Sequence, residues 1–222
     1  MELQQALETT GTIRFYRPDP ISDSVLASIL DAARYAPSGG NRQPVRFIAV
    51  RDAARKRALR DLYLPIWSGY AERVRKAVAD HPARLRLINN ADAFAQRLEE
   101  VPILLVVCAL EAELLATDRE LGRLSVVGGA SVYPAVQNVL LKARAEGVGT
   151  ALTTLLCAVE SKVKELLRIP DEFLTAAMIT LGYPAKGFPT RLKRRPLEEI
   201  AFVDEFGKSL AAPTSSGGPT AG

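Results

Sequence analysis

Residues 36–44 concentrate side chains that can bind a ligand through hydrogen bonds. Between Pro37 and Pro44 lie four polar side chains, Ser38, Asn41, Arg42 and Gln43. Gly39 and Gly40 give the backbone access to positive φ and let another molecule approach it closely. Polar segments rich in Gly and Pro are usually plain connections between elements. The composition alone therefore supports a binding loop and an ordinary loop about equally.

Two further segments carry groups that suit an anionic ligand. Near the N-terminus, Thr10 and Thr12 supply hydroxyl groups, and Gly11 supplies backbone freedom. Arg14 adds a fixed positive charge, so this turn could hold a phosphate. Residues 191–197 form the densest charge cluster of the chain. Each segment, taken alone, is more simply interpreted as solvated surface.

The sequence offers little for catalysis by side chains or metals. His81 is the only histidine, which argues against a histidine metal site and a Ser-His-Asp triad. It precedes a proline, and we expect it to be exposed. Cys108 and Cys157 are far apart and form no CxxC pattern, so neither a disulfide framework nor a zinc site is predicted. We expect no catalytic side chain and no bound metal.

The overall composition is that of an ordinary globular protein. The chain has 222 residues, of which 48% are hydrophobic and 24% charged. A net charge of +4 suits an anionic ligand but is too weak to indicate a nucleic-acid partner. The N-terminus lacks the basic start and apolar core of a signal peptide. No apolar run approaches the roughly 20 residues that span a bilayer. We therefore expect a soluble, cytoplasmic protein with no membrane partner.

Hydrophobic periodicity and capping signals predict helices alternating with strands in a single α/β or α+β domain. Helices are predicted at residues 2–9, at 25–33 after a cap near Ser22, after a cap at Asp52, and at 124–146 and 160–168. Strands are predicted at residues 45–50, 102–109, 150–155 and 175–184. The helix at 124–146 is the longest pattern and almost wholly apolar, which indicates burial or a subunit interface.

Two regions have less regular patterns. Residues 66–98 are predicted to form loosely packed surface helices, broken between His81 and Pro82 and again at Asn89 and Asn90. A lid over a site and a solvated insertion explain this excursion equally well. Residues 211–222 are rich in Pro, Ser and Gly and are predicted to be disordered.

Four pieces of the chain, taken in order, resemble the nitroreductase family of FMN-dependent oxidoreductases over residues 9–200. They are the turn at 10–14, the Pro-Ser-x-x-Asn-x-Gln-Pro loop at 37–44, Gln137 and Asn138 leading to 147–154, and the Leu-Gly-Tyr-Pro turn at 181–184 followed by 193–196. The resemblance implies an α+β fold, an α/β/α sandwich with a central mixed sheet. It also implies an intertwined homodimer with flavin sites at the subunit interface. Residues 1–205 would then be one FMN-binding domain, and 206–222 a disordered or partner-embracing tail.

The resemblance also assigns residues to the cofactor. The FMN ribityl and phosphate would be surrounded by Thr10, Gly11, Thr12 and Arg14, with Lys193 and Arg194 closing on the phosphate. The other subunit would contribute Ser38, Gly39, Asn41 and Gln43. The flavin ring would lie against Thr153, Thr154 and the backbone at Leu155. Trp67 and Tyr70 are candidates for covering a substrate, although aromatic residues at this spacing are more often packing.

One departure from the family pattern concerns the phosphate. The family usually begins its first motif with one or two basic residues, where this chain has Thr10 and Gly11. Losing a charge-assisted contact costs on the order of 1.5–3 kcal/mol. The chain is thus expected to bind FMN more weakly, unless a neighbour such as Lys193 holds the phosphate.

The activity implied by the resemblance is ping-pong hydride transfer. NAD(P)H would reduce FMN and leave, and an electron-poor small molecule such as a nitroaromatic or quinone would then be reduced. One alternative is a deiodinase-like reductive dehalogenase, but residues 66–98 contain no convincing equivalent of that branch's Glu/Tyr/Lys lid. Another is a flavin-sequestering protein without turnover. A nucleic-acid module at 191–195 would need interleaved aromatic residues, which are absent there.

Overall fold

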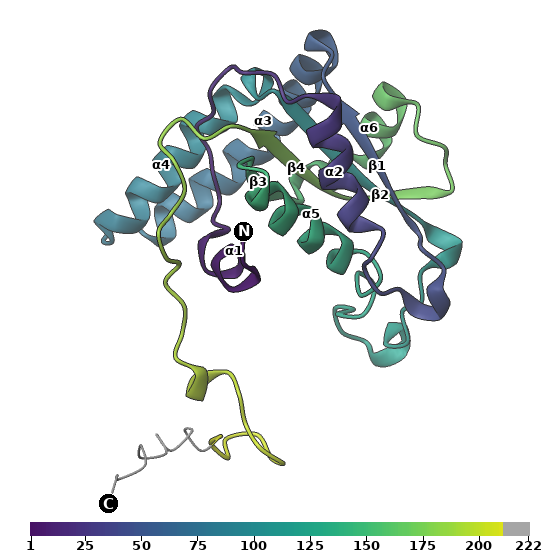
Figure 1. Ribbon diagram of the computed structural model, residues 1–222, viewed down its shortest axis with the longest axis vertical. Helices are drawn as coiled ribbons and strands as arrows, with labels where there is room; N and C mark the ends of the chain where they lie inside the picture. Colours follow the sequence, from purple (N-terminus) through teal and green to yellow (C-terminus); the bar gives the residue numbers. More distant parts are fainter. Residues whose placement is uncertain (211–222) are drawn as a thin grey trace, which may run out of the picture. The chain divides into compact units, whose positions relative to one another are not determined.

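The computed structural model describes residues 1–210, and these belong to two compact units. The first, Met1–Thr190, contains a four-stranded sheet with helices on both faces (Figure 1). The second begins at Arg191 and, as far as it is described, contains one short 3₁₀ turn, Leu197–Glu199. The predicted disorder of residues 211–222 lies outside the described residues. The expected domain boundary at residue 205 stays a prediction.

The sheet consists of β1 (Val45–Val50), β2 (Ile103–Leu110), β3 (Gly149–Thr153) and β4 (Phe173–Gly182). Its strand order is β1-β2-β4-β3, and every neighbouring pair is antiparallel. The expected mixed sheet is therefore wrong for these four strands. The segment that could add a parallel edge strand meets β3 at a single bridge, Thr12 with Thr150. Further along the same segment, Tyr16 forms an isolated antiparallel bridge with Pro184, two residues after the end of β4.

Successive side chains of β2 point to opposite faces of the sheet, and each face is covered by its own layer of helices. Leu104, Val106 and Cys108 point to one core cluster, and the intervening residues point to the other. The first cluster is covered by α3 (Ala53–Ala77), α4 (Pro82–Gln96) and α6 (Glu160–Leu167). The second is covered by α2 (Asp23–Ala33) and α5 (Tyr133–Ala145) (Figure 1). The predicted strand at 102–109 is thus present and buried on both faces, and the predicted α+β class is confirmed.

Local capping signals predicted helix starts accurately. The Ser22 hydroxyl accepts from the Val25 backbone N–H at 3.3 Å, and Asp52 accepts from the Arg55 N–H at 2.9 Å. The short N-terminal helix α1 (Leu3–Thr9) is also present. After α5, Gly147 has a φ of 74°, the left-handed conformation in which a glycine commonly ends a helix.

The helical region at residues 66–98 is more regular than predicted. The break before Pro82 is confirmed, because α3 ends at Ala77 and α4 begins at Pro82. The break at Asn89 and Asn90 is wrong, since both lie inside α4. Their neighbours Ile88, Ala91 and Phe94 are buried in the core. This packing outweighs the weak helix preference of asparagine. The two helices form a packed hairpin, not a loose surface layer.

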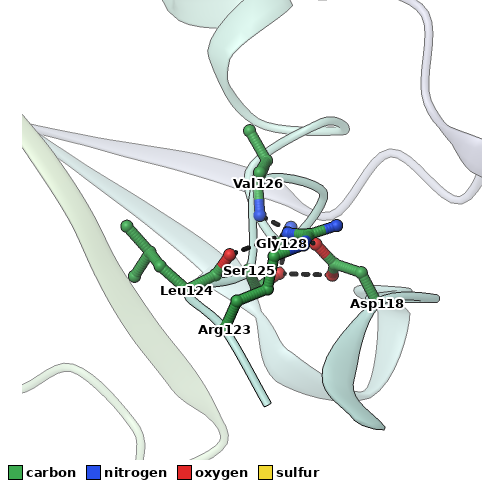
Figure 2. A network of polar contacts seen from close by, with 6 residues as sticks. All are labelled: Asp118, Arg123, Leu124, Ser125, Val126 and Gly128. Carbon is green, nitrogen blue, oxygen red and sulfur yellow. Dashed lines mark hydrogen bonds and ion pairs between the residues drawn. The ribbon is translucent and has the colours of Figure 1, made fainter. Parts of the chain in front are cut away.

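The helix predicted at 124–146 begins only at Tyr133. The preceding residues form a loop held by the Asp118 carboxylate, which accepts from the Ser125 hydroxyl at 2.7 Å, the Val126 N–H at 2.9 Å and Arg123 at 2.9 Å (Figure 2). These bonds, led by the one from Ser125, lower the pKa of Asp118. Val126 is 80% exposed, so the apolar period of this segment does not mark a buried helix face. The longest helix is α3, with 25 residues.

Among the described residues, none of the helices combines the length and apolar character needed to cross a membrane.

Candidate functional site

A cavity of about 610 Å³ opens between the α3–α4 hairpin and the end of β3. Seven of the residues predicted to bind cofactor or substrate line it: Thr12, Arg14, Trp67, Tyr70, Thr153, Thr154 and Leu155. They come from segments up to 143 positions apart in the sequence (155 − 12). The fold therefore brings together one end of the first motif, the end of β3 and the aromatic residues of the hairpin.

The floor of this cavity is fixed by the pairing of residues 12–16 with the sheet. The Ile13 N–H donates to the Thr150 carbonyl at 2.8 Å. Gly149 allows this approach, because a Cβ there would lie 2.9 Å from Ile13. This arrangement places Thr12 and Arg14 beside residues 153–155.

A partly buried tyrosine, Tyr16, connects this floor to the sheet. The Tyr16 hydroxyl donates to the Ile13 carbonyl at 2.5 Å and shares a 2.7 Å hydrogen bond with Thr180. Thr180 in turn accepts from the Ala151 N–H at 3.1 Å. Burial raises the pKa of Tyr16, against the opposing effects of the Thr180 hydrogen bond and the charge of Arg14. Tyr16 is thus a neutral hydrogen-bond donor that joins the first motif to β3 and β4.

Arg14 is a positive charge without an acidic partner in the described residues. Among the described residues, no Asp or Glu lines the cavity, and Arg14 and Arg84 are its only charged side chains. The field inside the cavity is therefore positive and favours an anionic ligand.

Three aromatic residues of α3 form one wall of the cavity. Tyr63 and Trp67 are stacked with ring centroids 6.3 Å apart, and Trp67 meets Tyr70 at 5.7 Å. The Trp67 indole N–H donates to Asp92 at 2.8 Å, and Asp92 also pairs with Arg75 at 3.0 Å. Trp67 is 7% exposed and Tyr70 is 42% exposed. Trp67 therefore builds the wall, while Tyr70 is the more accessible of the two predicted substrate residues.

Sequence reasoning missed Tyr63, which lies at the floor end of this wall. Burial raises its pKa, while a hydrogen bond to Thr153 and the nearby Arg14 oppose the shift. Its position could have been found from the spacing of Tyr63, Trp67 and Tyr70, which places all three on one helix face.

Thr10 and Gly11 do not line the cavity. The Thr10 hydroxyl donates to the Ala6 carbonyl at 2.7 Å, and the Gly11 N–H donates to the Thr9 carbonyl at 2.9 Å. Both contacts end α1. Their predicted role at the cofactor is not visible in this geometry and stays a prediction.

The 37–44 loop faces a different cavity. Ser38 and Gln43 line a space of about 190 Å³ beside Ser131 and Phe47. The Ser38 hydroxyl accepts from the Gln43 N–H at 3.0 Å, and the Gly39 N–H donates to Ser131 at 3.1 Å. Within one chain, therefore, the structure does not bring Ser38, Gly39, Asn41 and Gln43 to the large cavity.

The backbone of the 37–44 loop is unusual. Asn41 has a φ of 54° and Gln43 a φ of 52°, both in the left-handed region. Asparagine tolerates this conformation but glutamine has no such preference. Strained backbone of this kind collects at binding and catalytic sites, which favours the binding interpretation of the loop over that of a plain connection.

The lysine and arginine predicted to bind the phosphate from the C-terminal side lie in the other unit of the structure. Lys193 and Arg194 belong to the second unit, so the structure does not place them against Arg14. Sequence reasoning missed Lys186, which lines a space of about 200 Å³ together with Thr12 and Arg14. Its ammonium lies 5.6 Å from the centre of the Phe15 ring. The only sequence signal was its position just after the Leu-Gly-Tyr-Pro turn.

A helix-covered antiparallel sheet with a positively charged, aromatic-walled cavity at one end defines the class of protein. The chain belongs to the nitroreductase family, whose model matches residues 7–183. A protein of Thermus thermophilus named NADH dehydrogenase is 34% identical over 200 residues, covering 86% of this chain and 90% of that protein. The 5,6-dimethylbenzimidazole synthase of Rhodospirillum rubrum is 29% identical, covering 80% and 79%.

A solved structure shows the same fold. Oxidised iodotyrosine deiodinase bound to FMN and 3-iodo-L-tyrosine matches with a TM-score of 0.73 and 24% identity, over 92% of this chain and 100% of that one. The two sequence relatives carry the names of two different activities. Membership of the family therefore does not identify the second substrate, which must be argued from the cavity.

Proposed function

We propose that this protein is an FMN-dependent oxidoreductase that passes reducing equivalents from NAD(P)H to an electron-poor small molecule such as a quinone or nitroaromatic. The observation that carries the proposal is the cavity that joins Arg14, residues 153–155 and the aromatic wall of α3. Its volume of about 610 Å³ suits a cofactor-sized ligand. The match to a relative named NADH dehydrogenase supports NADH or NADPH as the electron donor.

The residues present fit FMN, which has a flat ring and an anionic phosphate. Thr12 and Arg14 would hold its polar side, and Thr153, Thr154 and the Leu155 backbone would contact the ring. Thr10, Gly11, Lys193 and Arg194 remain proposed contacts of the phosphate. When bound, FMN accepts a hydride and later donates it, which is chemistry that the side chains cannot supply.

The chain's own contribution is electrostatic and steric. Arg14, with no carboxylate beside it in the described residues, would stabilise negative charge that develops in the cavity during reduction. Tyr63, Trp67 and Phe94 would exclude water from the reacting atoms. The cavity lining contains no His, Asp, Glu or Cys, which is compatible with a reaction in which the cofactor carries the chemistry.

The site as proposed is completed by a second copy of the chain. The 37–44 loop has strained backbone and polar side chains but lies outside its own chain's large cavity. In a homodimer, Ser38, Gly39, Asn41 and Gln43 would reach the cavity of the partner. The family resemblance supports this arrangement.

The deiodinase-like alternative is less well supported by the cavity. A zwitterionic amino acid would need an acidic group for its ammonium, and no Asp or Glu lines this space. Flavin sequestration without turnover is tested directly by the experiment below.

The test is to add FMN to the purified protein and follow oxidation of NADH and NADPH with 1,4-naphthoquinone or a nitroaromatic compound. We expect a yellow protein that oxidises at least one of the two nucleotides in the presence of an acceptor. A yellow protein that never oxidises either would indicate sequestration. A protein that does not bind FMN would overturn both proposals.

A further inference from the structure

The large cavity runs along the α3–α4 hairpin. One wall is a single face of α3, formed by Tyr63, Trp67, Tyr70, Val74 and Val78. The other wall is a single face of α4, formed by Arg84, Leu87, Ile88, Ala91 and Phe94. Arg84 and Phe94 are ten positions apart, which corresponds to about 15 Å along a helix. The cavity is therefore much longer than a single aromatic ring.

Positive charge is placed at the two ends of this cavity. Arg14 lies at the floor end, near Tyr63 and Thr153. Arg84 lies in the first turn of α4, near the turn that joins the two helices. Between the two arginines the walls are made of aromatic and aliphatic side chains.

Arg84 differs from a neighbouring arginine of the hairpin. Arg75 pairs with Asp92 at 3.0 Å. Arg84 has no ion pair in the described residues, the first turn of α4 contains no acidic residue, and no carboxylate lines the cavity. A guanidinium at the end of an apolar cavity, without a carboxylate from its own chain, is suited to bind one from a ligand.

We propose that this cavity selects an elongated acceptor with a flat electron-poor ring beside residues 153–155, where the flavin ring is proposed to lie, an apolar body along the hairpin, and a carboxylate bound by Arg84. The inference rests on the proposed function and names the class of its second substrate.

The test uses naphthoquinones with alkyl chains of increasing length that end in a carboxylate or in its methyl ester. With the FMN-loaded protein, we expect the KM of the acids to fall below that of the esters by about tenfold once the chain spans the cavity, as for one charge-assisted contact. Short chains, which cannot reach Arg84, should show no such difference. Arg84→Gln should abolish the preference. Arg86→Gln removes the same charge from a residue of α4 that is exposed like Arg84 but does not line the cavity, and it should retain the preference.

A second measurement is independent of turnover. Trp67 is the only tryptophan of the chain and lines the cavity, so its fluorescence reports occupancy. Titration of the full-length protein with the long-chain acid should quench this fluorescence at lower concentrations than the ester. Arg84→Gln, but not Arg86→Gln, should remove the difference.

Several outcomes would overturn the inference. Equal KM and equal quenching for acid and ester at every chain length would exclude an anion site at Arg84. A rise in the KM for NAD(P)H in Arg84→Gln, with the acid preference unchanged, would assign Arg84 to the nucleotide instead. Failure to oxidise NAD(P)H with any acceptor would refute the proposed function, whereas Arg84-dependent quenching would still support the binding site.

Discussion

In the proposed function, binding of the anionic cofactor depends most directly on Arg14. It lines the large cavity and two smaller adjoining spaces, and it has no acidic partner in the described residues. The basic residues that usually precede it in the family are replaced by Thr10 and Gly11, whose observed contacts end α1. At this end of the cavity, few side chains are therefore available to bind a negatively charged group.

The substitution Arg14→Gln tests how much the charge of Arg14 contributes to FMN binding, because glutamine keeps hydrogen-bonding capacity and removes the charge. We expect the Kd for FMN to rise about ten- to a hundredfold, as a charge-assisted hydrogen bond contributes about 1.5–3 kcal/mol. Quenching of flavin fluorescence on binding measures this constant. Arg17→Gln is the matched control, since Arg17 pairs with Asp19 at 3.0 Å on the surface and does not line the cavity. An unchanged Kd in Arg14→Gln would move phosphate binding to Lys186, Lys193 or Arg194.

Tyr16 stabilises the floor of the cavity as a neutral phenol. In Tyr16→Phe the Ile13 carbonyl and Thr180 lose a partly buried hydrogen-bond partner, so the free energy of unfolding should fall by about 1–3 kcal/mol. Because folding raises the pKa of Tyr16, its contribution is complete below the unfolded-state pKa of about 10 and is lost as the pH rises above it. Urea unfolding of both proteins at pH 7, 9 and 10.5 should give equal differences at the first two values and a smaller one at the third. A difference that grows with pH would contradict this role.

At the level of elements, the contact between residues 12–16 and β3 positions half of the site. Gly149 makes this contact possible, since a Cβ at residue 149 would lie 2.9–3.0 Å from three atoms of the β-branched Ile13. The displacement needed to relieve that overlap would carry Thr12 and Arg14 away from residues 153–155. We therefore expect a substitution at Gly149 to affect both packing and the proposed binding of the cofactor.

Gly149→Ala should therefore reduce both stability and FMN affinity. We expect a loss of about 1–3 kcal/mol in unfolding free energy, as for other overpacked cores, together with a higher Kd for FMN. Gly69→Ala is the control, because nothing lies within 4 Å of its added Cβ, and alanine should stabilise α3 by up to about 1 kcal/mol. Combining Gly149→Ala with Ile13→Ala should give a smaller loss than the sum of the two single changes. Strict additivity would show that the two residues do not compete for space.

Elements specified by local chemistry could be predicted from the sequence, and those specified by distant contacts could not. Ser22 and Asp52 cap helices with their own neighbours, and the apolar run of β2 has no other good explanation than a buried strand. By contrast, residues 124–132 have a helical apolar pattern but form a loop because of the buried Asp118 carboxylate. The helix across Asn89 depends on core packing of its neighbours.

The same distinction applies to the site. Thr12, Arg14 and residues 153–155 could be predicted because they carry recognisable motifs, and the fold brings them to one cavity. Tyr63 shares a helix face with Trp67 and Tyr70, a spacing visible in the sequence, but Arg84 carries no motif. Arg84 joins the cavity only because α3 and α4 pack as one hairpin, and the sequence of α4 alone does not contain that information.

At the scale of the whole molecule, one chain provides two incomplete halves of the proposed site. The large cavity has a cation, hydroxyl groups and an aromatic wall but no contact with the strained 37–44 loop. If a homodimer joins the halves, each cavity must receive the loop of the other copy. The alternative is that the loop serves only the smaller cavity of its own chain, and the two arrangements differ in how damaged subunits complement each other.

Subunit mixing distinguishes these arrangements. Arg14→Glu damages the large cavity, and Asn41→Gly removes a loop side chain while keeping a residue that tolerates the φ of 54°. Each variant alone should bind FMN poorly and oxidise NAD(P)H slowly. If the loop acts on the partner, a mixed dimer contains one site with both Arg14 and Asn41 intact. Unfolding and refolding an equal mixture should then restore about a quarter of all sites, because half of the dimers are mixed and half of their sites are whole.

The recovery should appear in the amount of FMN bound as well as in turnover. Mixing either variant with itself is the control, and neither should recover. No recovery in the mixture of variants, with native size confirmed by light scattering, would place Asn41 and Arg14 at the same cavity of one chain or remove Asn41 from the site. A protein that is monomeric at all concentrations would refute the shared site outright, because the loop lines a different cavity from Arg14 within its own chain.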